Sequence, residues 1–371
     1  MLKRARIRTK LFLTVLAVTV PAMIVVGALA YLGGKAAVTR TTLDHLTSVR
    51  ASKTSQIESY FRQIRAQAQT FSEDLMVVAA MRELSRAHRT LRDAPLTPGQ
   101  REAVVAYYTD VFLGRLNDHT AEPVALESVL PKDDRALLLQ HEFIAANPHQ
   151  LGWKDRLDAA DDVGVYSAVH GKYHPILREF MHRFGYHDVF LIDTEGNIVY
   201  SVSKEADFGT SLLDGPYRES NLASAFAAVR DAPASGLVRI VDFVHYRPSY
   251  DAPASFIASP IDDGRERLGV LVFQMPDEEI ERVMTGNQNW RADGLGETGE
   301  TYLVGPDFKM RSDSRFILED PDGYLAALAD AGGSAFDLTR IRDFGTSILL
   351  QEVRTEAATA ALAGETATTQ T

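Results

Sequence analysis

The sequence predicts an α+β fold, with an N-terminal transmembrane helix, a long stalk helix and two tandem lobes with antiparallel sheets. Three observations predict this organisation. Residues 11–32 carry no charge, residues 35–91 contain neither glycine nor proline, and the pentapeptide DFGTS occurs at 207–211 and again at 343–347. These are the marks of a membrane anchor, an uninterrupted helix and a duplicated module.

The uncharged segment is long enough to cross a bilayer, which takes about 20 apolar residues in a helix. Five basic residues lie in the first ten positions, so the positive-inside rule places them in the cytoplasm and everything after about Gly34 outside it. A cleaved signal peptide is the alternative, with ALAYLGG as a weak cleavage site. Both alternatives export the body of the chain, and we favour the uncleaved anchor.

Composition limits the classes of function. The net charge is −11, and because the first ten residues contribute +5, the remainder carries −16. An acidic body repels nucleic-acid backbones, which argues against binding of DNA or RNA. The absence of cysteine excludes disulfides, cysteine–zinc sites and a cysteine nucleophile.

The stalk carries one apolar stripe at the three- and four-residue steps of a helix, apart from one gap. Its members are Leu43, Leu46, Ile57, Tyr60, Ile64, Phe71, Leu75 and Val78. Two explanations are open: a seam between the two copies of a homodimer, or packing on the chain's own domain. Either way, a helix that leaves the membrane can carry a small displacement inward.

Three further helices are predicted after the stalk. Thr97 and Pro98 form a helix start, and that helix should run to about Leu116. A second helix follows Pro131, and a third starts at Pro175 with Gly185 as its C-terminal stop.

After these helices the pattern becomes that of strands. The strings HDVFLID and NIVYSVS flank the turn TEG and predict a hairpin. The first DFGTS and a helix over SNLASAFAAVR come next. Three strands are then predicted in GLVRIVDFVHY, ASFIASPI and RLGVLVFQM. This is the order of a PAS-like lobe, a five-stranded antiparallel sheet with helices on one side.

The second half begins in the same way. ETYLVG and KMRSDS predict a hairpin, the second DFGTS follows after 24 extra residues, and EAATAALAG predicts a helix. In both copies we expect the glycine to permit a turn, and the Thr or Ser to cap the helix that follows. No run resembling the last three strands follows Gly364. We therefore expect a second lobe that lacks those strands, in a chain that is a piece of a larger receptor.

Three strings carry a family resemblance: GYHDVFLIDTEGNIVYSVSKEADFGTSL, APASFIASPI and GLGETGETYLVGPDFKMRSDSRF. Over roughly residues 1–364 the chain resembles the double Cache sensor region of bacterial transmembrane receptors, the type found on chemoreceptors, adenylate or guanylate cyclases and sensor kinases. The resemblance implies a dimeric sensor of small molecules in the bacterial inner membrane. It also implies that the ligand sits in the membrane-distal lobe.

Four units follow from the pattern and the resemblance. We expect a cytoplasmic N-terminus and transmembrane helix, a stalk helix, a helical layer with the membrane-distal PAS-like lobe, and a membrane-proximal PAS-like lobe. Their bounds are 1–34, 35–95, 96–285 and 286–371.

The resemblance places a ligand between the sheet of the first lobe and the loops and helices that cover it. The candidate residues are Tyr200, Asp242, Tyr246 and Arg247. Arg247 could pair with a carboxylate and Asp242 with an amine, while the tyrosines add contact area. Alternatively, these are ordinary strand residues. The arginine–tryptophan–tyrosine element of amino-acid-binding Cache sensors is not found before the first hairpin, so amino acids are not favoured.

Other motifs in the sequence give weaker support for the functions with which they are usually associated. DFG in a kinase needs a Gly-rich loop, a strand lysine and a catalytic loop, none of which is present. GLGETG matches a dinucleotide motif, but a strand follows it where a helix is needed. Four histidines, at 170, 174, 182 and 187, could bind metal, although a solvated helix surface explains them as well.

The sequence therefore predicts the extracytoplasmic sensor region of a receptor, with no catalytic constellation, no metal and no cofactor. A membrane-anchored periplasmic scaffold that binds a partner protein is the alternative. An open cavity in the first lobe favours the sensor, and a collapsed one favours the scaffold.

Overall fold

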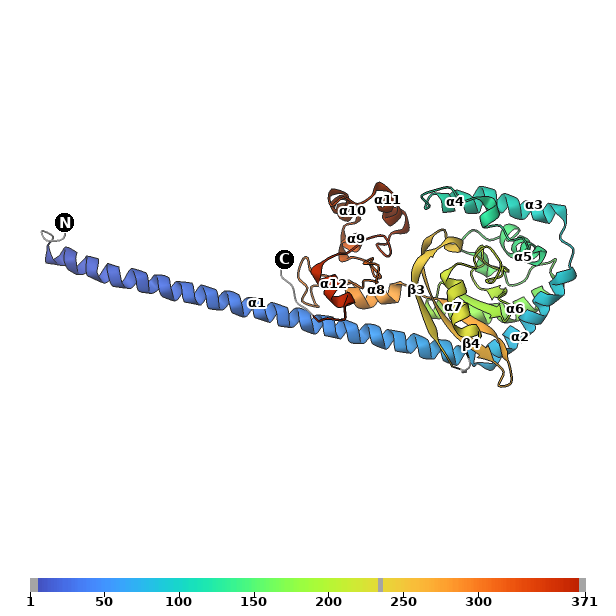
Figure 1. Cartoon of the computed structure of the whole chain (residues 1–371), viewed down its shortest axis with the longest axis horizontal. Helices are drawn as coiled ribbons and strands as arrows, with labels where there is room; N and C mark the ends of the chain where they lie inside the picture. Colours follow the sequence, from blue (N-terminus) through green and yellow to red (C-terminus); the bar gives the residue numbers. More distant parts are fainter. Residues whose placement is uncertain (1–5, 233–235, 367–371) are drawn as a thin grey trace.

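The computed structural model describes residues 6–232 and 236–366, and shows a long rod attached to a globular body (Figure 1). The rod is α1 (Ile7–Ser72), a single helix of 66 residues, which corresponds to a length of about 100 Å. Among the described residues it is the one helix long and apolar enough to cross a membrane. Pro21 lies inside it.

The stalk is not continuous to residue 91, as the sequence analysis expected. The rod ends at Ser72, and α2 (Leu75–Thr90) starts a new direction. The side chain of Asp74 accepts a hydrogen bond from the backbone N–H of Met76 at 2.7 Å, which is the geometry of a helix N-cap. The expectation was wrong because an aspartate can begin a helix without any glycine or proline before it.

The stalk stripe packs on its own domain in its middle part. Ile57, Tyr60 and Ile64 are buried in the main core, whereas Leu46 is 41% exposed. Leu75, at the start of α2, is 84% exposed, so the prediction that it belongs to a buried stripe was wrong. The second of the two explanations therefore holds for residues 57–64 of the stripe. Dimerisation through the exposed part of the rod stays a prediction.

The helical layer starts where the sequence predicted. Thr97 caps α3 (Pro98–Tyr107) in a reciprocal capping box with Gln100. The helix continues through a π-helical turn (Tyr108–Phe112) into α4 (Leu113–Asn117), which confirms the predicted end near Leu116. After Pro131 the chain forms α5 (Asp134–Gln140), extended by one further π-helical turn.

The third predicted helix, α6 (Gly164–Phe184), begins 11 residues before Pro175, so the predicted start was wrong. Pro175 lies inside the helix, and the buried residues Tyr166 and Tyr173 lie upstream of it. Packing of this upstream face, rather than the proline, sets where the helix begins. Gly185 ends the helix in the left-handed conformation, as predicted.

The first lobe holds a five-stranded antiparallel sheet in the order β2-β1-β5-β4-β3. All five predicted strands are present, and the predicted helix α7 (Asn221–Arg230) follows its N-cap, Ser220. The strands are β1 (Asp188–Asp193), β2 (Ile198–Ser201), β3 (Arg239–Tyr246), β4 (Ala252–Asp262) and β5 (Arg267–Gln274).

Helices cover both faces of this sheet, not one as expected. Phe190 and Phe256 point from the sheet towards α7. Leu191 and Phe273 lie in the main core on the opposite face, with α1, α2 and α6. Successive strand residues alternate between two buried faces, which explains why these strands read as nearly continuous apolar runs.

The second lobe is mainly helical. Its predicted hairpin forms only an isolated bridge, Val304 to Met310, and within residues 286–366 no strand is present. A lone strand pair is marginally stable without further strands beside it. The predicted helix over EAATAALAG is confirmed as α12. α8 (Glu278–Thr285) leads from the first lobe into this part, whose helices are α9 (Arg315–Glu319), α10 (Pro321–Asp330), α11 (Ala335–Phe344) and α12 (Glu356–Leu362).

The second lobe contacts both the rod and the first lobe. Lys53 of α1 forms an ion pair with Asp293 at 2.7 Å. On the other side, the buried side chain of Arg311 pairs with Asp242 of β3 at 3.0 Å. These contacts place the second lobe beside the stalk and at one end of the first lobe's sheet (Figure 1).

Candidate functional site

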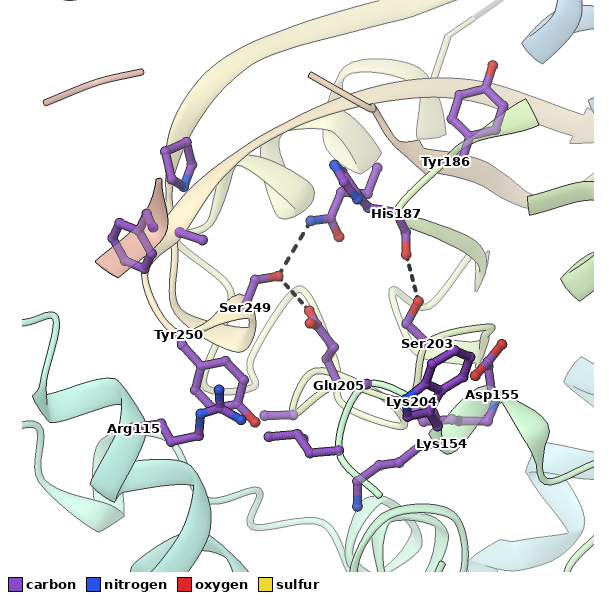
Figure 2. Close-up of a pocket in the computed structure, with 18 of the residues that line it drawn as sticks. Arg115, Lys154, Asp155, Tyr186, His187, Ser203, Lys204, Glu205, Ser249 and Tyr250 are labelled. Atoms are coloured by element: carbon purple, nitrogen blue, oxygen red, sulfur yellow. Dashed lines mark hydrogen bonds between the residues drawn. The ribbon is translucent and has the colours of Figure 1, made fainter. Parts of the chain in front are cut away.

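A cavity of about 700 Å³ lies at this end of the sheet (Figure 2). Its walls come from the helical layer, the loop after β2, the turn between β3 and β4, and the second lobe. The residues that carry the argument below are Arg115, Lys154, Lys204, Glu205, Ser249 and Tyr250. From the second lobe, Asp313, Phe344, Gly345 and Thr346 complete the lining.

The loop after β2 forms one wall and is held to the sheet by side chains. Ser249 donates a hydrogen bond to Glu205 at 2.6 Å, and Gln274 at the end of β5 donates to Ser249 at 3.4 Å. Figure 2 shows the hydrogen bond between Ser249 and Glu205. Ser203 donates to the carbonyl of His187 at 2.6 Å, which ties the loop to the start of β1.

Lys204 occupies the middle of this loop and is almost fully buried. Its ammonium donates to the carbonyl of Ser201 and lies 4.7 Å from the ring centre of Tyr200 and 4.9 Å from that of Phe208. Burial lowers the pKa of Lys204, since the charged form loses its hydration. The aromatic rings offset part of this cost through cation–π attraction.

Three carboxyl groups lie in or beside the same loop: Asp188 and Asp207 are buried, and Glu205 is partly exposed to the cavity. Burial, followed by the charge of Asp207, raises the pKa of Asp188. Burial likewise raises the pKa of Glu205 to about 7 and that of Asp207 to about 7. The hydroxyl of Tyr246 donates to Asp207. A carboxyl group with such a pKa exchanges its proton near neutral pH.

The opposite wall is cationic and aromatic. The guanidinium of Arg115 lies 5.1 Å from the ring centre of Tyr250 (Figure 2). Lys154 lies 4.6 Å above the ring of Tyr107 and donates to the carbonyl of Ile144. Burial lowers the pKa of Lys154 to about 8. Because both signs of charge line the cavity, it can hold a polar molecule with an anionic group near Arg115.

One cluster has the residue types of a metal site. The ligand atoms of His187, Asp277 and Glu278 lie within 4.8 Å of one another. The imidazole of His187 is 3.1 Å from Asp277 and 3.7 Å from Glu278. These distances are those of an ion pair, and the side chain of Glu278 is 73% exposed. We therefore treat the cluster as an ion pair at the start of α8.

The histidines of α6 do not form a solvated surface, so that explanation was wrong for His170 and His174. Both are fully buried, and their rings stack at 4.4 Å. His174 lies 2.7 Å from the hydroxyl of Tyr200. Burial lowers the pKa of His174 to about 2, so it stays neutral. His182 is the exposed member and pairs with Asp155 at 2.9 Å.

The four residues predicted to bind a ligand are not brought together, and none of them lines the cavity. Tyr200 and Tyr246 are buried directly behind the loop after β2, against Lys204 and Asp207. Asp242 pairs with Arg311 of the second lobe, and Arg247 is exposed. Their role in ligand binding stays a prediction.

Sequence reasoning missed the charged residues that do line the cavity. Two of them, Lys204 and Glu205, lie between a strand and the first DFGTS. Two adjacent charged residues directly after a predicted strand were the signal from which Lys204 and Glu205 could have been found. Arg115 and Lys154 gave no signal, because they reach the cavity only through the packing of the helical layer.

Comparisons with known proteins gave no family model that matches the chain and no curated protein that matches it. Solved structures of sensor and ligand-binding domains are similar, and two are described below. One is the sensor domain of the V. cholerae histidine kinase DctB, at 18% identity over 51% of this chain and 61% of that one, with a TM-score of 0.25. This chain thus spans less than two thirds of that domain.

The other is the ligand-binding domain of the Pseudomonas fluorescens chemoreceptor CtaA in complex with L-serine. It matches at 13% identity over 60% of this chain and 75% of that one, with a TM-score of 0.27. Similarity at this level assigns neither a ligand nor a residue role to the chain.

Proposed function

We propose that the chain is the extracytoplasmic small-molecule sensor region of a bacterial transmembrane receptor. In this proposal α1 anchors it in the inner membrane, with the residues after about Gly34 outside the cytoplasm. The observation that supports it best is the cavity of about 700 Å³, lined by charged and aromatic side chains of both lobes. Cavities of this size suit small molecules, and convergent polar groups fix their orientation.

The contacts of the second lobe suggest how binding would reach the membrane. Thr346 and Phe344 line the cavity, and the same lobe holds the rod through Asp293, which pairs with Lys53 and accepts from His45 at 3.2 Å. A ligand that favours one packing of the two lobes would therefore shift the position of the rod. Such a change between two packed states is the usual form of a signalling transition.

The open cavity supports the sensor over the alternative, a membrane-anchored scaffold that binds a partner protein without sensing a ligand. The proposal contains no catalytic step. Ser249 is a hydroxyl at the cavity, yet its hydrogen-bond partners within the described part of the chain are Glu205 and Gln274, not a histidine. An activated serine needs a base beside it.

Thermal shift of the full chain in lipid nanodiscs, screened against a metabolite library, tests the proposal. A ligand at 100 times its Kd adds about 2.7 kcal/mol to the free energy of unfolding, enough to raise the melting temperature. We expect Arg115→Ala to abolish the shift and Arg265→Ala, a matched change at an exposed residue outside the cavity, to keep it. A library without a single stabilising compound would contradict direct sensing.

The proposed receptor is a homodimer, because the proximal part of the rod exposes apolar residues beyond the membrane segment, including Val38 and Leu46. Crosslinking of a cysteine at position 46 in native membranes tests this, since the chain has no cysteine of its own. We expect the cysteine at position 46 to give a crosslinked dimer band. A cysteine at the exposed position 322 of α10 should give none.

A further inference from the structure

We infer that the loop after β2 is itself a binding site whose ligand is the proton, taken up by the carboxyl groups of Glu205 and Asp207. The inference rests on the proposed function, since proton uptake is a signal only in a sensor. It adds a ligand whose concentration changes with the acidity of the compartment.

The first observation is an unsatisfied buried oxygen. The side chain of Asp207 is fully buried, and Tyr246 donates to one of its oxygens. The other oxygen has no hydrogen-bond partner among the described residues, and the same holds for one oxygen of Asp188. A buried carboxylate oxygen without a donor is costly, whereas a neutral carboxylic acid lowers that cost.

The second observation is a charge imbalance. Asp188, Glu205 and Asp207 act on one another electrostatically, and each raises the pKa of another. None of the three forms an ion pair within 4.0 Å in the described structure. The one buried cation nearby, Lys204, donates to the carbonyl of Ser201, and its charge acts on Asp188 alone among the three. Three neighbouring carboxyl groups with a single buried cation beside them cannot all stay ionised.

The groups that face this pair are mainly tyrosines, together with two groups that can carry positive charge, His187 and Lys204. Asp207 faces tyrosines of the helical layer, of the segment before α7 and of β3. Glu205 faces Ser249, two cavity tyrosines and, through space, His187. The titratable neighbours are Tyr107, Tyr108, His187, Asp188, Lys204, Tyr217, Tyr246 and Tyr250, with Arg115 on the far side of Tyr250.

Proton uptake at this pair would reach the junction of the lobes. Glu205 accepts from Ser249 in the turn between β3 and β4, and Asp207 accepts from Tyr246 just before that turn. The same turn is held by the second lobe, where the buried side chain of Arg340 pairs with Asp251 at 3.0 Å. Neutralising the two acids weakens their charge-assisted hydrogen bonds to the turn, and so changes its packing on the second lobe.

The sign of the pH dependence follows from the raised pKa values. Between about pH 4 and pH 7 the folded chain holds protons that the unfolded chain has released. The contribution of the pair to stability therefore falls as the pH rises through this window, and is constant above it. Acidification stabilises the first lobe through these two groups.

Infrared difference spectroscopy and melting curves of the full chain in nanodiscs test this between pH 5 and pH 8. We expect a protonated carboxyl band that is lost as the pH rises through about 7. Asp207→Asn and Glu205→Gln, which mimic the neutral acids, should each weaken the band and flatten the fall of melting temperature with pH. Asp343→Asn, the same change in the second DFGTS, should alter neither.

Wild-type spectra without a protonated carboxyl band at pH 6 would overturn the inference, whether or not the variants fold. So would an unchanged band and an unchanged pH slope in Asp207→Asn. Neither result bears on the metabolite screen at neutral pH, so failure of proton binding and failure of small-molecule sensing are distinguishable.

Discussion

The two DFGTS copies have the same five residues and different surroundings. In the first copy Asp207 and Phe208 are completely buried, while in the second the side chain of Asp343 is 40% exposed and Phe344 is half-buried at the cavity. Both glycines are left-handed, with φ of +80° at Gly209 and +68° at Gly345. The repeated letters specify a turn, and burial is decided by what packs on that turn.

The copies also lie differently against their hairpins. The backbone of Thr210 accepts from Ile198 at the start of β2. In the second copy Ser347 donates its backbone N–H to Asp313 at 2.6 Å, near the other end of the corresponding segment. Nor do Thr or Ser of either copy cap the next helix, since Ser220 and Thr355 do so. That expectation from the sequence was wrong.

The largest difference between the copies should appear on truncating their phenylalanines. Phe208→Ala removes a fully buried ring and should cost about 3–5 kcal/mol of unfolding free energy, as other buried rings do. Phe344→Ala removes a half-buried ring and should cost roughly half as much or less. Urea unfolding in nanodiscs measures both. Equal losses would mean that the second copy is also core.

The next largest difference in stability is expected when the two glycines are replaced by alanine. A methyl group at Gly209 would lie 3.3 Å from the backbone of Ala136, whereas at Gly345 it meets nothing within 4 Å. Gly345→Ala should cost about 1–2 kcal/mol for the left-handed backbone alone. Gly209→Ala should cost more, because crowding adds to that strain. We therefore expect the lower melting temperature for Gly209→Ala. A lower melting temperature for Gly345→Ala would contradict this explanation.

The hydrogen bonds that hold the second DFGTS copy to Asp313 can be removed by a single substitution. Asp313 accepts from the hydroxyls of Thr346 and Ser347 at 2.7 and 2.9 Å, as well as from the backbone of Ser347. Asp313→Ala leaves these donors unpaired and should cost about 1–3 kcal/mol, with faster proteolysis of the second lobe. Asp322→Ala, on an exposed part of α10, is the control and should leave the cleavage rate unchanged.

The smallest effect is expected at the second aspartate. Asp343 lies 3.9 Å from His119, and its side chain is partly exposed, so the pair contributes little. Asp343→Asn should change the free energy of unfolding by less than about 0.5 kcal/mol. A loss of more than 1.5 kcal/mol in the same urea titration would give this residue a structural role like that of Asp207.

Local sequence predicted the elements of the first lobe well. The strand runs, the cap at Thr97 and the stop at Gly185 depend on neighbouring residues, and all of them are confirmed. The break at Asp74 is also local, and was missed because an aspartate cap was not weighed against a run without glycine or proline.

The site was harder to predict because its contacts span long distances in sequence. Asp242 looked available for a ligand amine, but Arg311, 69 residues away, already holds it. Lys154 and Lys204 meet at one cavity although they come from different layers. Asp207 is buried by residues from distant parts of the chain. Such burial cannot be predicted from the periodicity of the segment that contains the residue.

The rod has one more consequence. Because α1 is helical without a break from the apolar segment 11–32 to Lys53, where it pairs with Asp293, the rotational phase of one end fixes that of the other. One residue inserted between 34 and 53 would turn the apolar segment by about 100° relative to the lobes, while seven would nearly restore its orientation. A receptor built on such a rod would respond to insertions by their helical phase rather than by their length.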